Sequence, residues 1–227
     1  MQVVQMLDGL QSAIEDLATT GREVTLVCSH TVSHLLVMPR YAMLRRILGP
    51  QVELRLLTAE YNLVQAAIDT GADIVFEYAS APPERQHVIV CPEEIKPVGT
   101  RAIVDQAIAA LDGNGPPPPL LSLQRENHGW LSWTDWLTDR PAAAGWSISE
   151  THDNYVYLLE AAVAGNGLAL GWRGFVNSYV ERGDLVELPG DWFSKGTHIY
   201  ARLTRHGAQN TAAQKCLHLL SDLLSAE

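Results

Sequence analysis

The chain has 227 residues, enough for one large domain or for two lobes of roughly 100 residues each. Hydrophobic residues make up 47% and charged residues 19%, which is typical of a folded protein with a substantial core and excludes a disordered chain. The net charge of −10 argues against binding of nucleic acid by this chain itself, because Lys and Arg supply most of the affinity for phosphates.

Membrane and metal features are weak in the sequence. No apolar run approaches the roughly 18 residues of a membrane span, and residues 1–5 lack the basic and apolar parts of a secretory signal. We therefore expect a cytoplasmic protein with no membrane partner. Cys28, Cys91 and Cys216 are odd in number and far apart, and no Cys/His spacing is typical of zinc. We predict buried cysteines and no cofactor or metal.

Residues 1–20 have the apolar spacing of a helix that packs beside another helix. Steps of four and three residues form a heptad seam. A seam this short is marginal by itself, so the helix either packs on its own domain or is the end of a longer dimerising helix that begins before Met1. The seam consists of Val3, Leu7, Leu10, Ile14 and Leu17.

The next segment alternates strand and helix. Val24–Cys28, Val52–Leu57 and Asp73–Phe76 have the short β-branched and apolar runs of buried strands, and His34–Leu48 and Leu63–Asp69 read as helices between them. This order predicts a parallel sheet with right-handed crossovers. Ligands of such sheets lie beyond the carboxyl ends of the strands, where polar breaks precede the helices.

The second half repeats the alternation. His87–Cys91 is predicted as a strand that continues, extended, to Gly99 and crosses into a second lobe, since Pro92 and Pro97 block a helix. A capping box over Ser132–Asp135 predicts a short helix. The remaining predicted strands are Leu120–Leu123, Ser147–Ser149, Leu168–Trp172, Leu185–Leu188 and Ile199–Leu203, and the remaining helices are Ile103–Leu111, Tyr155–Ala164 and Ala212–Leu224.

The ordered set of segments resembles the effector-binding domain of LysR-type transcriptional regulators. The stretch "VTLVCSHTVSHLLVMPRYAMLRR" (Val24–Arg46) is similar to the family's opening strand, polar loop and helix. "AAIDTGADIVF", which ends at Phe76, is similar to its second helix and third strand. The most specific piece is "LLEAAVAGNGLALGW" (Leu158–Trp172), and "RGDLVEL" after it also fits.

The resemblance implies an α/β, two-lobed fold of the periplasmic-binding-protein type 2, each lobe a mostly parallel sheet flanked by helices. It implies a linker helix over 1–20, lobe I over 23–99 with 202–227, and lobe II over 100–201. It further implies homodimers, tetramers of the full-length regulator, and DNA contact only through a winged helix-turn-helix that precedes Met1. Two departures are His30, where small hydroxyl residues are commoner in the family, and the Trp-rich segment around Trp130, which resembles one subgroup only.

A small anionic or zwitterionic effector is the ligand expected in a cleft between such lobes. Two helix starts, Ser29–Ser33 and Thr151–Asn154, offer N–H groups and a positive dipole end to an anion. Arg125 is expected to clamp a carboxylate and Glu60 to hold an ammonium group, and an aromatic residue stacks over a ring or amine. The predicted effector-binding residues are Ser29, His30, Thr31, Ser33, Thr58, Glu60, Tyr78, Gln124, Arg125, Thr151, His152, Asn154 and Trp172.

Each of these assignments has a simpler alternative. The hydroxyl residues can serve only as helix caps, and Arg125 and Glu60 can be solvated surface charges. His30 and His152 are expected to donate or accept hydrogen bonds and to make binding pH-dependent, because no third ligand spacing supports a metal.

Three other functions share parts of this pattern. A transport-type solute-binding protein shares the fold but not the heptad helix. For an enzyme of the same fold, the sequence offers no GxSxG, P-loop or GxGxxG motif. The strongest catalytic candidates would be His30, His152 and Glu60. A thiol redox sensor is not expected, because the sensing cysteines of the family lie in the second lobe. Regulation is expected to be a population shift, driven by different effector affinities of two arrangements.

Overall fold

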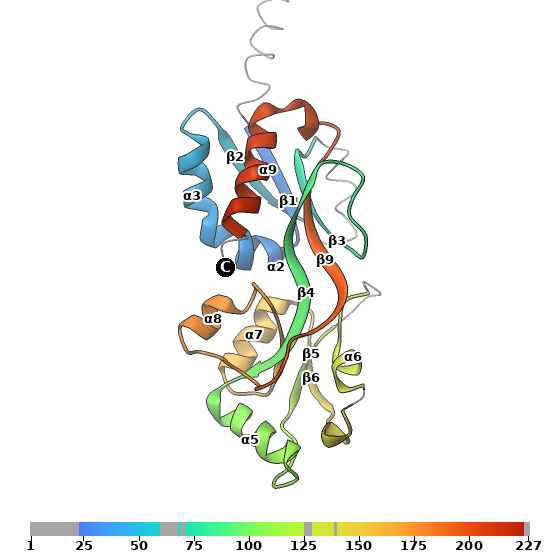
Figure 1. The fold of residues 1–227 in the computed structure, drawn as a ribbon. Coiled ribbons are helices and arrows are strands. Elements are labelled where there is room, and N and C mark those ends of the chain that lie inside the picture. The colour runs from blue at the N-terminus through green and yellow to red at the C-terminus, as the bar shows by residue number, and fades with distance from the viewer. Residues whose placement is uncertain (1–22, 60–67, 69–70, 125–128, 139, 225–227) are drawn as a thin grey trace, which may run out of the picture. The chain divides into compact units, whose positions relative to one another are not determined.

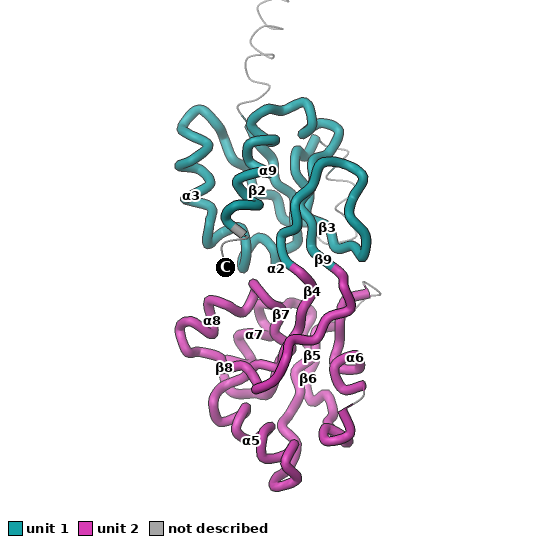
Figure 2. The backbone as a smooth tube through the Cα atoms, viewed as in Figure 1, with its two compact units in different colours: residues 1–91, 198–227 teal, residues 92–197 magenta. Residues whose placement is uncertain are grey.

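The computed structural model describes residues 23–59, 68, 71–124, 129–138 and 140–224. Its contacts divide the chain into two compact units, residues 1–91 with 198–227 (unit 1) and residues 92–197 (unit 2), which Figure 2 colours separately. The boundaries fall inside the long strands β4 (His87–Gly99) and β9 (Phe193–Leu203), so the chain passes between the units twice in extended form. The predicted helices over 1–20 and Leu63–Asp69 lie outside the described residues, apart from position 68, which is helical.

Unit 1 is built on the predicted parallel strands (Figure 1). The first strand, β1 (Glu23–Cys28), pairs in parallel with β2 (Glu53–Thr58) on one side and with β3 (Ile74–Ala79) on the other. Val24–Cys28 is buried throughout, as expected for a central parallel strand covered on both faces. On its far side β3 pairs antiparallel with β9, which brings the end of the chain back into this sheet.

The helix after β1 begins four residues earlier than expected. Ser29 caps it, and α2 (His30–Val32) continues through a π-helical turn, Ser33–Val37, into α3 (Met38–Leu48). The polar residues that suggested a loop are therefore the first turn of the helix. Pro39 is the second residue after the wide turn, and the carbonyl four residues before it, that of Leu35, belongs to this turn. A wider turn relieves the clash between a proline ring and that carbonyl. Helix α9 (Thr211–Leu224) packs on β1 and α3, and its Cys216, Leu217 and Leu220 are buried.

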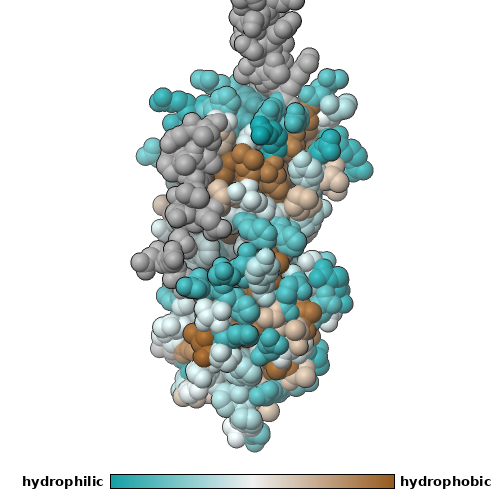
Figure 3. Space-filling view, turned by 180° about the vertical axis from the view of Figure 1, so that it is seen from behind, coloured by the Kyte–Doolittle hydropathy of each residue, from teal (hydrophilic) through white to brown (hydrophobic). Residues whose placement is uncertain are grey.

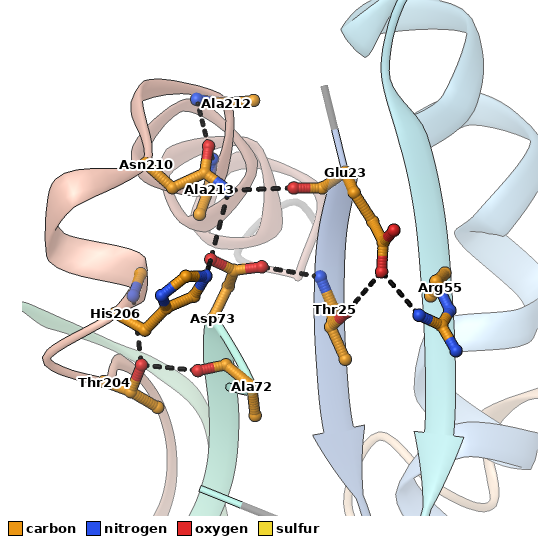
Figure 4. A network of polar contacts seen from close by, with 11 residues as sticks. Glu23, Thr25, Arg55, Ala72, Asp73, Thr204, His206, Asn210, Ala212 and Ala213 are labelled. Atoms are coloured by element: carbon orange, nitrogen blue, oxygen red, sulfur yellow. Dashed lines mark hydrogen bonds and ion pairs between the residues drawn. The ribbon is translucent and has the colours of Figure 1, made fainter. Parts of the chain in front are cut away.

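A buried polar network joins β1, β3 and the start of α9 (Figure 4). The Asp73 carboxylate is 3% exposed and accepts from the Thr25 N–H at 2.8 Å and from Asn210 Nδ2 at 3.1 Å. Asn210 Nδ2 also donates to the Glu23 carbonyl, and its Oδ1 accepts the N–H groups of Ala212 and Ala213, so it caps α9. Burial raises the pKa of Asp73 above its ordinary value, although these donors and nearby His206 act in the opposite direction.

Unit 2 has a parallel pair, β5 (Leu120–Leu123) with β6 (Ile148–His152), and an antiparallel pair, β4 with β7 (Ala169–Trp172). The predicted capping box opens α6 (Trp133–Leu137), whose Trp133 and Trp136 are buried and meet edge to face. Prolines 92 and 97 lie within β4, which is one unbroken strand. The other elements are α5 (Arg101–Leu111), α7 (Tyr155–Val163), α8 (Asn177–Glu181), β8 (Val186–Glu187) and the short 3-10 helices Pro141–Ala143 and, in unit 1, Gly207–Gln209.

Among the described residues, no helix combines the length and apolar character that a membrane crossing requires.

We expect Asn210→Ala to lower the free energy of unfolding by about 2 kcal/mol, because it removes the cap of α9 and leaves the buried Asp73 carboxylate one donor short. Urea denaturation followed by circular dichroism measures this. The matched control is the exposed neighbour Gln209→Ala, which should change stability by less than about 0.5 kcal/mol. Equal losses in both variants would show that the network adds nothing to stability.

We expect Gly207→Ala to destabilise the protein by more than about 2 kcal/mol, since an added Cβ would lie 2.1 Å from the Asp73 carbonyl oxygen, a backbone atom that cannot move aside cheaply. Gly115→Ala is the control, because its Cβ would meet only Ala109 at an ordinary 3.6 Å. Thermal unfolding of both variants tests this, and a Gly207→Ala protein as stable as Gly115→Ala would contradict the close approach.

Candidate functional site

The predicted residues of unit 1 lie at one edge of its sheet. Cys28 is in register with Thr58, and the Ala59 N–H donates to the Cys28 carbonyl at 3.0 Å, so the end of β2 lies beside the helix start at Ser29. Tyr78 lies near the end of β3, the strand that flanks β1 on the other side. The parallel order thus brings Ser29–Ser33, Thr58 and Tyr78 to the carboxyl edge where ligands of such sheets bind. Glu60 lies outside the described residues.

The hydroxyl groups at this helix start have different tasks. Ser29 Oγ accepts the Val32 N–H at 3.3 Å, so it acts as the cap. Ser33 is 5% exposed and its Oγ donates to the His30 carbonyl at 2.9 Å. Thr31 is partly exposed and His30 is exposed. Of the three hydroxyl residues predicted here, Thr31 is therefore the one best placed for a ligand.

The predicted residues of unit 2 gather where β5 and β6 end. Leu123 is in register with His152, and the Gln124 N–H donates to the His152 carbonyl at 2.6 Å. Asn154 caps α7 by accepting the Val156 N–H at 2.9 Å. The helix start predicted at Thr151 lies further along the chain: Thr151 and His152 end strand β6, and only Asn154 caps α7. Thr151 is exposed. Arg125 lies outside the described residues.

The His152 side chain is the least satisfied group at this edge. Its Nε2 is buried and has no hydrogen-bond partner among the described residues. Among the described residues, Glu150 Oε2 lies 3.7 Å away, which is within ion-pair range but too far for a hydrogen bond. A buried polar atom in this state is a place where a ligand atom or a water can bind.

A pocket within unit 2 opens next to this edge. The space between its lining atoms, open solvent included, is about 250 Å³, and its lining is mostly leucine and tryptophan with two serines. Four elements contribute to the wall. The lining consists of Leu121–Leu123 of β5, Leu131–Trp133, Leu158 of α7, and Leu170 and Trp172 of β7.

Glu93 shapes this wall and was missed by the sequence analysis. It is 2% exposed, and its Oε1 accepts the Leu131 N–H at 2.7 Å and the Trp172 indole N–H at 3.3 Å. One carboxylate oxygen therefore holds two parts of the pocket wall. The signal was present in the alternation of β4, in which Glu93 shares the buried face with Cys91 and Ile95.

The cysteines are structural, as predicted. All three are buried. Burial raises the pKa of the Cys28 and Cys216 thiols to about 12, so neither forms a thiolate near neutral pH. These two residues therefore lack the reactivity of a redox-sensing thiol.

Comparison with known proteins places residues 18–225 in a match to the LysR substrate binding domain. No curated protein is similar enough to count as a match. Among solved structures, the AmpR effector binding domain from Citrobacter freundii has a TM-score of 0.68 at 18% identity, over 91% of this chain and 100% of that one. The regulatory domain of HypT from Salmonella typhimurium has a TM-score of 0.64 at 17% identity, over 92% and 98%.

A longer structure extends the comparison. Full-length HypT, described as a hypochlorite-specific LysR-type transcriptional regulator, aligns over 100% of this chain and 77% of its own, with a TM-score of 0.61 and 18% identity. At these identities the structural likenesses establish the fold, which is the expected two-lobed α/β architecture.

We expect Glu93→Ala to lower the free energy of unfolding by about 2–4 kcal/mol, because the buried Leu131 backbone N–H and the partly buried Trp172 indole N–H both lose their acceptor. The neighbouring Glu94→Ala is the control. It removes an ion pair with Arg173 at a partly exposed position and should cost less than about 1 kcal/mol. Chemical denaturation of the two variants decides the matter, and similar losses would argue against a special role for Glu93.

Proposed function

The chain belongs to the LysR substrate-binding domain family, and on that basis we propose that it senses a small anionic or zwitterionic metabolite for a LysR-type transcriptional regulator. The observation that carries the proposal is the family match over residues 18–225. It is supported by the placement of the predicted residues at the carboxyl ends of strands in both units. The family is one of regulatory domains, and no group of three or more metal-ligating side chains occurs in the described part of the chain.

We assign the polar contacts as follows. Thr31 and Thr151 offer hydroxyl groups near two helix starts, and the unsatisfied Nε2 of His152 offers a third polar atom. Arg125 would clamp a carboxylate and Glu60 would bind an ammonium group. We assign Trp172 in unit 2 and Tyr78 in unit 1 as the aromatic side chains that stack over a ring or an amine of the effector. The effector acts by binding one arrangement of the domain more tightly than another, since equal affinity would shift nothing.

DNA binding and oligomerisation are further parts of this proposal. Because the chain is negatively charged, we propose that a winged helix-turn-helix elsewhere in the regulator contacts the DNA. A cytoplasmic location is part of the same proposal. A homodimer is supported by exposed apolar side chains on adjacent elements: Met43 and Ile47 of α3, and Leu57 of β2. The two elements are joined by the Tyr41 hydroxyl, which donates to the Leu54 carbonyl at 2.6 Å. On the face drawn in Figure 3, hydrophobic residues lie in separate groups among hydrophilic ones.

A thermal-shift screen tests the sensor function. Amino acids, aromatic acids, dicarboxylates and quaternary amines are added to the chain in a buffer that contains EDTA. A ligand at one hundred times its dissociation constant should add about 2.7 kcal/mol, a rise in Tm of roughly 2–4 °C for a chain of this size.

The variants make the screen specific to the candidate site. Thr31→Ala or Thr151→Ala should abolish the shift produced by the effector, because each removes a hydroxyl contact. Thr211→Ala is the matched control, an exposed threonine at the start of another helix, and should keep the full shift. A ligand whose shift survives both site substitutions binds elsewhere and would contradict the assigned residues. Turnover of that ligand would favour an enzyme instead.

A further inference from the structure

Two helices of unit 2, α5 and α7, are followed by the same three residues. Gly113–Gly115 comes after α5 and Gly165–Gly167 after α7, and each segment reads Gly-Asn-Gly. The first glycine of each has a left-handed backbone, with φ of 74° and 83°. In both, the asparagine N–H donates to the carbonyl five residues earlier, at 2.8 Å for Asn114 and 3.1 Å for Asn166. One motif therefore closes both helices, and the two asparagines form a matched pair.

An asparagine directly before a glycine has a route to modify itself. The backbone nitrogen of the glycine attacks the side-chain Cγ of the asparagine, so a new N–C bond forms and the C–NH₂ bond breaks. Ammonia leaves and takes the proton of the glycine N–H, and the product is a five-membered succinimide. Water then opens the ring at either carbonyl and leaves aspartate or isoaspartate. Glycine favours this attack, because it has no Cβ to obstruct it and few limits on its dihedral angles.

The surroundings of Asn114 leave this route open. Asn114 and Gly115 are exposed, and the Asn114 amide and the Gly115 N–H have no hydrogen-bond partner among the described residues. A Cβ added at Gly115 would meet a single alanine at an ordinary 3.6 Å. Further along the chain, the exposed side chain of Gln106 donates to the carbonyls of Pro116 and Pro117 at 3.4 and 3.2 Å. The peptide between Asn114 and Gly115 can therefore turn toward the side chain.

The surroundings of Asn166 block the same route. Gly167 is buried, and a Cβ added there would lie 2.5 Å from the Pro119 carbonyl oxygen, so two backbone segments are in close contact. The next residue, Leu168, donates its N–H to the same Pro119 carbonyl at 2.9 Å. Asn166 Nδ2 also donates to Glu150 Oε2 at 3.5 Å. Rotation of the peptide after Asn166 requires these contacts to open first.

We propose that Asn114 is a site of spontaneous covalent modification, which converts it through a succinimide into aspartate and isoaspartate, and that the fold protects Asn166 from the same reaction. The new carboxylate lies just beyond the C-terminal end of α5, close to Asp112. The helix dipole is negative there, and the last turn of α5 carries no basic residue. The modification thus adds an unfavourable charge to the end of α5 as the protein ages.

Incubation of the folded chain in mildly alkaline buffer without effector tests the site, because the attacking nitrogen must lose its proton. Peptide mapping by mass spectrometry measures the conversion of each asparagine as a mass gain of about 1 Da. We expect Asn114 to convert at least about tenfold faster than Asn166, since reaction of a locked segment follows its rare open form. In urea the two asparagines should convert at comparable rates, because a glycine follows both.

The variant Gly115→Ala tests the chemistry at Asn114. It should slow conversion of Asn114 at least about tenfold, because the new Cβ obstructs the attack, and should leave Asn166 unchanged. Its Cβ meets only an ordinary contact, and circular dichroism confirms that the variant is folded. The proposal is overturned if Asn166 converts as fast as Asn114 in the folded chain. It is also overturned if Asn114 stays intact there while the chain in urea is converted. No effector takes part, so neither outcome affects the proposed sensor function.

Discussion

The buried carboxylate of Asp73 is the interaction on which unit 1 depends. The buried Thr25 N–H at the start of β1 needs an acceptor, and the side chain of Asp73, directly before β3, supplies it at 2.8 Å. The same carboxylate binds Asn210, which caps the helix that covers the sheet. Residues more than 130 positions apart are thereby joined through one side chain. Because a charge this deeply buried is costly when unpaired, its donors must all be in place together.

The candidate ligand edges of both units are built by one local device, a strand that ends in a capped helix. In unit 1 the cap is Ser29, and in unit 2 it is Asn154. Each cap satisfies one N–H group of the helix start and still leaves the positive end of the helix dipole near the ligand edge. The structure thus combines helix stability with an attraction for anions. Ser29 and Asn154 are the caps, and the nearby hydroxyl groups of Thr31 and Thr151 are the ones that we propose for ligand contact.

The pocket of unit 2 depends on a buried side chain instead of a helix cap, because the Glu93 carboxyl group holds its wall. Glu93 lies in β4, the strand through which the chain enters unit 2, and binds both Leu131 and the Trp172 indole. Trp172 is also fixed through its backbone, because its N–H donates to the Tyr155 hydroxyl at 3.1 Å. Two polar contacts, one on the backbone and one on the indole, hold Trp172 in place at the pocket.

The sequence by itself determined the strand and helix order, the two-lobed α/β class, the capping box before α6 and the burial of the cysteines, because these follow from local periodicity, capping chemistry and the family resemblance. It did not place the start of the first helix, since Ser29–Ser33 has residues that suit a loop and a helix cap equally well. Only the tertiary structure decided that Asp73 and Glu93 are buried network centres and that the His30 ring stacks on the His34 ring. Each of these depends on partners that are distant in the sequence or on an irregular turn. For Glu93 the alternation of β4 indicates burial, but not the Leu131 and Trp172 partners.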